Sequence, residues 1–151
     1  MAITRLIYFS ENQIDPGAGS VVRQLSKILS ASNRNNKPLG LTGALVFDDM
    51  WFLQALEGPR DAVWKTFKRI EDDERHSEVM LVEVTDVPNR VFGNWWMGLA
   101  QLDEVSAPAF KPYLQDGRMK PHAMTAQQIL GLMTDLSNIG LSRELVSPMA
   151  V

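Results

Sequence analysis

The feature that most constrains the fold is a pair of short apolar segments separated by two acidic residues. GALVF (residues 43–47) and WFLQALEG (residues 51–58) lie on either side of Asp48 and Asp49. Two apolar runs joined by such a turn predict a β-hairpin. Because both faces of the second arm are apolar, we expect it to be buried on both sides.

Gln54 interrupts the middle of this second arm. Alternate residues of a strand share a face, so Gln54 points the same way as Phe52 and Leu56. A buried primary amide without hydrogen-bond partners costs about 1–3 kcal/mol. We therefore expect another polar group to meet Gln54 inside the fold.

Periodicity in the flanking segments predicts two helices and three more strands. The predicted elements are a strand at 4–10, a helix through Leu25, Ile28 and Leu29 that ends in the polar run 32–38, the hairpin, a helix through Val63, Phe67 and Ile70, and strands at 79–84 and 95–102. This order is that of a ferredoxin-like α+β sandwich. We expect a mixed five-stranded sheet with two helices on one face.

Residues 103–151 are expected to cover the other face of the sheet as a helical hairpin. AFKPYLQ (residues 109–115) predicts a short helix, and Thr125 and Gln128 have capping-box spacing at the start of a longer one. The apolar stripe of the longer helix consists of Ile129, Met133 and Leu136. We treat residues 1–102 as the main domain and the remainder as an extension within the same compact unit.

The composition argues against several kinds of chemistry. The 151 residues suit one domain and include no cysteine, which excludes disulfides and thiolate chemistry. His76 and His122 lie far apart without carboxylates at ligand spacing, so we predict no metal site. A glycine-rich phosphate loop and a nucleophile elbow are both missing. The net charge of −3 and the lack of a long apolar segment predict a cytoplasmic protein that binds neither nucleic acid nor membranes.

Tyr8 is the candidate partner of Gln54. It lies in the middle of the first predicted strand, so both side chains can point into the space between the sheet and its two helices. A phenol and an amide can satisfy each other there. Two interpretations remain open, a structural hydrogen bond in a closed core or a pair that faces a ligand between the helices.

Four other polar residues give weaker signals. Asn35 and Asn36 are placed just beyond the first helix, where asparagine is most often a turn residue. Arg69 and Asp73 are four residues apart on the second helix. That spacing predicts a surface ion pair.

The last predicted strand begins with three large side chains, Trp95, Trp96 and Met97. Alternation places Trp95 and Met97 on one face and Trp96 on the other. Residues of this kind most often belong to a core.

Taken together, several segments resemble the BLUF family, the blue-light sensors that use flavin. The matching segments, in order within residues 4–100, are RLIYFS, SASNRNNKPLGLTGAL, FLQALEG, VWKTFKRIEDDERHSEV and RVFGNWWMGL. The C-terminal segment PHAMTAQQILGLMTDL is similar to the helical extension of short, stand-alone BLUF proteins.

The resemblance implies a flavin, usually FAD, whose ring lies between the two helices that cover the sheet. Tyr8 would be the photochemical electron and proton donor, and Gln54 the switch that bridges Tyr8 to the flavin. The implied cofactor-binding residues are Tyr8, Ser32, Asn35, Asn36, Gln54, Arg69, Asp73 and His76. Trp95 and Met97 match positions that shift near the glutamine during signalling.

The resemblance also implies a blue-light photoreceptor without an attached catalytic domain. Its output would be a change in oligomer contacts or in binding to a separate partner, such as a response-regulator-like protein or a cyclic-dinucleotide phosphodiesterase. Two other functions remain open. One is a ligand-free ferredoxin-like interaction module, and the other is a flavin-dependent redox enzyme.

Overall fold

The computed structural model describes residues 2–14 and 21–141, and it has the expected α+β architecture. In this part of the chain five strands form one sheet, in the order β4-β1-β3-β2-β5. The strands are β1 (Ile3–Asn12), β2 (Thr42–Phe47), β3 (Trp51–Gly58), β4 (His76–Val87) and β5 (Gly98–Gln101). Only β2 and β5 pair in parallel, so the sheet is mixed, which confirms the ferredoxin-like prediction.

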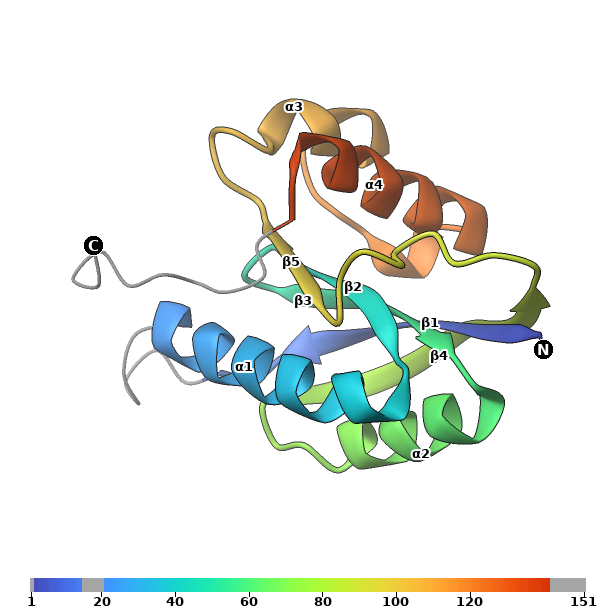
Figure 1. Cartoon of the computed structure of the whole chain (residues 1–151). Coiled ribbons are helices and arrows are strands. Elements are labelled where there is room, and N and C mark those ends of the chain that lie inside the picture. Colours follow the sequence, from blue (N-terminus) through green and yellow to red (C-terminus); the bar gives the residue numbers. More distant parts are fainter. Residues whose placement is uncertain (1, 15–20, 142–151) are drawn as a thin grey trace.

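Helices lie on both sides of the sheet (Figure 1). α1 (Val21–Leu39) and α2 (Arg60–Glu71) cover one face, and α4 (Ala126–Ile139) covers the other. The chain reaches α4 through α3 (Ala107–Phe110) and the short 3-10 turns η2 (Lys111–Tyr113) and η3 (Pro121–Ala123). The first arm of the predicted hairpin is a short helix, as expected, formed by α3 and the η2 turn that follows it directly.

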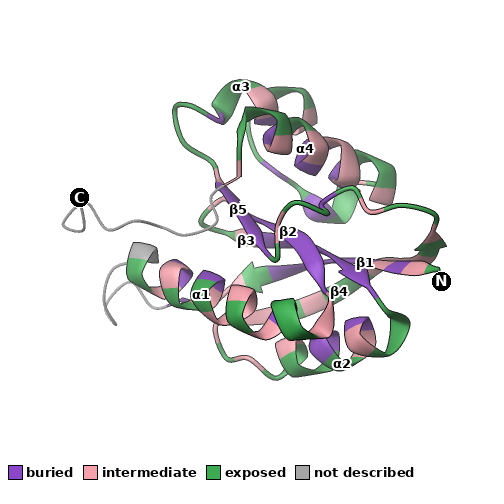
Figure 2. Cartoon of the chain, viewed as in Figure 1, coloured by how far each residue is buried: buried purple, intermediate pink, exposed green. Residues whose placement is uncertain are grey.

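The sheet separates two hydrophobic cores, and Figure 2 shows that buried residues run along its central strands. The core beneath α1 and α2 includes Leu6, Tyr8, Phe52, Leu56 and Met97. The core beneath α4 includes Ile7, Phe9, Leu53, Ala55 and Leu136. Both β1 and β3 thus alternate between the two cores, as their sequences predict, and β1 pairs with β3 so that Tyr8 lies opposite Gln54.

The fifth strand is shorter than predicted. It begins at Gly98 because the preceding residues are held by turns: the Trp95 N–H donates to Phe92 O, and Trp95 O accepts from the Gly43 N–H. Outside a strand the two-residue alternation no longer applies. Met97 packs in the core beneath α1 and α2, whereas Trp95 packs against the core beneath α4. The expectation that these two side chains share a face is wrong.

The first helix is longer than predicted, and Asn35 and Asn36 lie within it. α1 continues through Pro38 to Leu39 and is followed by Gly40, whose φ of 69° favours glycine. Asparagine is common in turns, so the polar run predicts a loop where the structure has the last turns of α1. Here one asparagine, Asn36, is buried on the inner face of the helix.

The start of α4 follows the predicted capping box. Thr125 Oγ1 accepts from the Gln128 N–H at 3.1 Å, and Gln128 Oε1 accepts from the Thr125 N–H at 2.9 Å. The predicted apolar stripe is buried beneath the helix; it consists of Ile129, Met133 and Leu136.

We expect Thr125→Ala to lower the free energy of unfolding by about 1 kcal/mol, because it removes the acceptor that caps the helix. Urea denaturation followed by circular dichroism measures this change. Thr125→Ser keeps the hydroxyl and is the matched control. Equal stability of the alanine and serine variants would contradict the assigned role of the cap.

Candidate functional site

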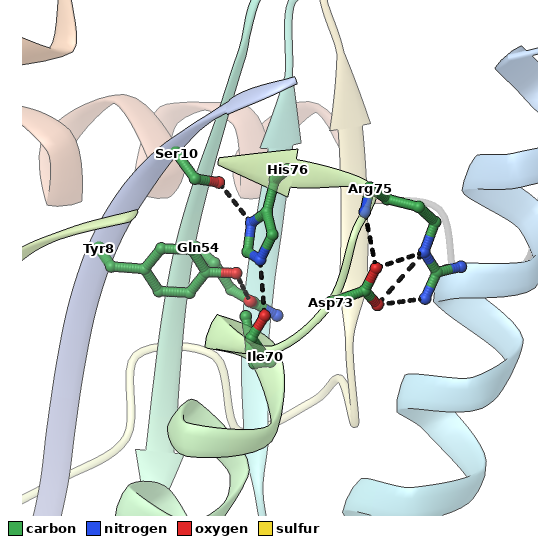
Figure 3. Close-up of polar contacts among 7 residues, drawn as sticks. All are labelled: Tyr8, Ser10, Gln54, Ile70, Asp73, Arg75 and His76. Carbon is green, nitrogen blue, oxygen red and sulfur yellow. Dashed lines mark hydrogen bonds and ion pairs between the residues drawn. The ribbon is translucent and has the colours of Figure 1, made fainter. Parts of the chain in front are cut away.

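The centre of the site is a hydrogen-bonded pair from two neighbouring strands. Tyr8 of β1 donates its hydroxyl hydrogen to Gln54 Oε1 on β3 (Figure 3). The other end of the amide, Gln54 Nε2, lies 3.5 Å from Met97 Sδ. Tyr8 and Gln54 are 2% and 4% exposed, so each depends on the other for its hydrogen bond. The polar partner predicted for Gln54 is therefore present, and it is Tyr8.

This pair lines a cavity of about 230 Å³ between the sheet and the helices α1 and α2. The lining residues are Tyr8, Ile28, Ala31, Ser32, Asn35, Asn36, Leu45, Phe52, Gln54, Leu56, Thr66, Arg69, Ile70, Asp73, Arg75 and His76. They include all eight residues that the sequence analysis singled out for cofactor binding. The structure thus brings these eight residues to one cavity from five separate elements and one connecting loop.

The two expected relay residues stand apart from this lining. Met97 touches the site through its sulfur, which lies 3.5 Å from Gln54 Nε2. Trp95 packs on the opposite side of the sheet, and Trp96 is 40% exposed. Of the three, Met97 alone is placed to sense the orientation of Gln54.

Asn36 connects the cavity to the residues before β5. Its side chain is 2% exposed, and Nδ2 donates to Trp96 O at 2.7 Å. The amide oxygen remains as an acceptor on the same group. One side chain of α1 thus both lines the cavity and holds the backbone next to Met97.

The predicted ion pair between Arg69 and Asp73 is wrong. Asp73 pairs instead with Arg75, whose Nη2 lies 2.5 Å from Asp73 Oδ2 and whose backbone N–H donates to Oδ1 at 2.9 Å. α2 ends at Glu71, so the four-residue helical spacing no longer places Arg69 beside Asp73. Hydrogen bonds from the Arg75 side chain lower the pKa of Asp73.

His76 is held at both ring nitrogens (Figure 3). Nε2 lies 2.6 Å from Ile70 O, and Nδ1 lies 2.7 Å from Ser10 Oγ. A carbonyl oxygen only accepts hydrogen bonds, so Nε2 carries the hydrogen and donates it. In the neutral ring Nδ1 then accepts from the Ser10 hydroxyl. This arrangement joins the end of α2 to β1 and fixes the wall of the cavity beside Tyr8.

The surroundings of Tyr8 keep it protonated. Burial raises the pKa of its hydroxyl well above the ordinary value, and the negative charge of Asp73 raises it further. The phenol is therefore neutral at physiological pH. Removal of an electron would make the phenol a far stronger acid, so an oxidised Tyr8 would release its proton readily.

Two residues at the site were missed by the sequence analysis. Arg75 lies two residues after Asp73 and holds its carboxylate by hydrogen bonds. A spacing of two residues does not by itself predict such a contact. Thr66, in the middle of α2, lines the cavity with a buried hydroxyl that has no hydrogen-bond partner among the described residues. A lone threonine in an amphipathic helix gives no such indication before the fold is known.

The comparisons with known proteins agree with this geometry. The BLUF family, described as sensors of blue-light using FAD, matches residues 3–98. The photoactivated adenylate cyclase subunit beta of Euglena gracilis is 37% identical over 92 residues, which are 61% of this chain and 10% of that protein. The chain thus spans about a tenth of the length of this curated relative.

Two solved structures resemble nearly the whole chain. BlsA in its photo-activated state has a TM-score of 0.77 at 23% identity, over 89% of this chain and 94% of that one. BlrB, a BLUF protein in its dark state, has a TM-score of 0.71 at 25% identity, over 90% of this chain and 95% of that one. The first likeness concerns the fold alone, and the second adds a family member of similar extent. The chain belongs to the BLUF family of blue-light sensors.

Proposed function

We propose that this protein is a blue-light photoreceptor in which Tyr8 and Gln54 form the photochemical switch. The observation that carries the proposal is their buried hydrogen bond at the wall of a cavity between α1 and α2. In a closed core the two side chains would only satisfy each other's hydrogen-bonding groups. Facing a cavity, it can exchange partners with a bound molecule.

The residues around the cavity fit a flavin ring, which is flat and apolar on its faces and polar along one edge. The apolar lining consists of Ile28, Ala31, Leu45, Phe52, Leu56 and Ile70. Polar groups that can meet the edge lie on both helices, including Asn36 and Thr66. The unpartnered Thr66 hydroxyl supports this fit because a buried polar atom without a partner is costly.

We assign the binding of FAD to the predicted polar residues of the lining. Ser32, Asn35 and Asn36 of α1 would hold one edge of the ring. Arg69 of α2, with the ordered Asp73 that follows it, would hold the polar side of the flavin. His76 would keep the wall in place rather than donate to the ligand, since both its nitrogens are already bonded.

When bound, the flavin supplies absorption of blue light and a site that accepts an electron. Tyr8 would give up an electron and its hydroxyl proton together to the bound flavin and would regain both afterwards, so nothing would be consumed. In the interval Gln54 would lose its donor and could rotate or tautomerise. Its amide has donor and acceptor ends of similar shape, so the change needs little movement of heavy atoms. Gln54 would then donate a new hydrogen bond to a carbonyl of the bound flavin, and that bond would shift the absorption to the red.

The output would pass through contacts of the protein's surface. We divide the chain into a flavin-binding domain of residues 1–102 and an extension of residues 103–151, whose described part, up to residue 141, completes the second core. A change at Gln54 would reach Met97 first, because its sulfur touches the amide. A separate signalling protein or a second copy of the chain would respond, with response-regulator-like proteins and cyclic-dinucleotide phosphodiesterases as the candidate classes. In the described residues no helix is long and apolar enough to span a membrane.

The decisive experiment is an absorption spectrum of the purified protein before and after blue light. We expect a yellow protein whose flavin bands shift to the red and return in the dark. Bleaching to a reduced flavin would favour a redox enzyme. Failure to bind FAD, FMN or riboflavin on reconstitution would leave only an interaction module.

Asn36→Ala should weaken flavin binding by about tenfold, because it removes hydrogen-bonding groups from the cavity wall and the bond to Trp96 O. Fluorescence titration of the flavin-free protein with FAD measures the affinity. The matched control is Arg34→Ala, an exposed position of the same helix. Equal affinities of the two variants would remove Asn36 from the binding site.

A further inference from the structure

Glu57, near the end of β3, is a fully buried carboxylate on the opposite side of the sheet from the cavity. Its oxygens accept hydrogen bonds from two successive backbone N–H groups, those of Val91 at 2.9 Å and 3.0 Å and of Phe92 at 2.7 Å. An ion pair to Arg5 is longer, at 3.6 Å. A buried charge is tolerated only when it is well bonded, so these N–H groups are its main support.

The two N–H groups belong to a segment that crosses the sheet. The crossing segment, residues 88–97, links β4 at one edge to β5 at the other, on the side of α4 (Figure 1). Phe92 is fully buried in the core on that side. Beyond it the backbone turns and delivers Met97 to the cavity side, where the sulfur meets Gln54.

Nearer to β5, the backbone of the crossing segment is held by hydrogen bonds between neutral groups. Trp95 O accepts from the Gly43 N–H at 3.1 Å, and Trp96 O accepts from Asn36 Nδ2 at 2.7 Å. These are bonds between neutral groups, whereas the bonds to Glu57 involve a charge and are about twice as strong. The Arg90 guanidinium adds charged bonds to Thr42 Oγ1 at 2.9 Å and to the backbone oxygen of Glu57 at 3.0 Å. The charged fixation of the crossing segment therefore lies at residues 90–92, and Glu57 takes part in it five residues before Met97.

We propose that Glu57 is a positioning residue for the switch: its carboxylate fixes Val91 and Phe92 and thereby sets where Met97 stands beside Gln54. The inference rests on the proposed function and adds a residue to it. Glu57 and Gln54 lie three residues apart on one strand but point to opposite faces. The strand thus carries both the switch and the anchor of the group that contacts it.

The test uses Glu57→Gln, which keeps the size of the side chain. Oε1 of Glu57 accepts from both N–H groups, and Oε2 accepts a second bond from Val91. In the amide the remaining oxygen carries no charge, and an NH₂ donor takes the place of Oε2 beside the Val91 N–H, so the bond to Oε2 and the charge assistance of the others are lost. We expect the rate of dark recovery after blue light to change by about tenfold, the effect of losing a hydrogen bond to a charged group. The wild type and Ile129→Val, a mild core change beneath α4, are the references.

A double-mutant cycle with Met97→Leu shows whether Glu57 acts through Met97. In the leucine background, Glu57→Gln should change the recovery rate by less than about twofold. Amide exchange of Val91 and Phe92, measured by NMR without flavin, should be faster in Glu57→Gln than in Ile129→Val.

Three outcomes would overturn the inference. They are a recovery rate in Glu57→Gln equal to that of Ile129→Val, the same tenfold effect in both backgrounds, and unchanged exchange of both amides. A wild type without any light-induced shift would contradict the proposed function instead, and the amide exchange would still decide whether Glu57 holds the segment.

Discussion

Gln54→Leu is expected to abolish the light-induced red shift while the protein still binds flavin. Leucine has similar bulk but can neither accept from the Tyr8 hydroxyl nor donate to a flavin carbonyl, so both arrangements of the switch are lost. The Tyr8 hydroxyl also loses its partner, which should lower the free energy of unfolding by about 1–3 kcal/mol. Difference spectroscopy and thermal denaturation measure the two effects.

The matched control is Gln127→Leu, the same substitution at an exposed position of α4. It should leave the spectrum and the recovery rate unchanged. Gln54→Glu is a second informative variant, because a carboxylate cannot present a donor at neutral pH. A normal light-minus-dark spectrum in Gln54→Leu would show that the switch lies elsewhere.

Tyr8→Phe is expected to bind flavin and to lose the productive photocycle. The ring still packs against Phe67, with centroids 5.5 Å apart in the wild type, but the hydroxyl that supplies the proton is gone. We expect the yield of the red-shifted state to fall by at least about a hundredfold, since no other tyrosine is near. Flash photolysis of the purified variant measures this yield.

Tyr113→Phe is the control, because the chain contains only two tyrosines. Tyr113 also donates a hydrogen bond, to Asp135 at 2.7 Å, but it lies on the α4 side of the sheet. That bond to Asp135 raises the pKa of Tyr113 to about 12. An equal loss of yield in both variants would mean that a tyrosine hydroxyl matters for the fold and not for the photochemistry.

The central pair could be predicted from the sequence because it depends on strand alternation alone. Tyr8 and Gln54 sit in two regular strands with apolar residues on both sides, so a period of two fixes their faces. The same argument failed for Trp95 and Met97. Those residues precede β5 and lie outside any strand, and the backbone of Trp95 bonds to Phe92 and Gly43. The pattern of side chains does not predict such backbone bonds.

The sequence also does not predict hydrogen-bond partners that are backbone groups. Glu57 bonds to N–H groups more than thirty residues away, and every residue except proline carries an N–H. Asp73 pairs with Arg75 rather than with Arg69 because α2 ends at Glu71. The end of a helix is the least certain part of a prediction from sequence. The position of each charge could be guessed, but its partner could not.

One sheet lines both hydrophobic cores, and this limits how the sensor can be fused to other proteins. Its central strands send every second side chain, such as Ile7, Leu53 and Ala55, into the core beneath α4. Removal of the extension would expose that apolar face to water, and a face of this kind attracts other chains. An interchangeable effector module could therefore replace the extension only if it brought its own apolar surface to the same strands. The residues that sense light and the protein that responds to them would therefore pack on opposite faces of the same sheet.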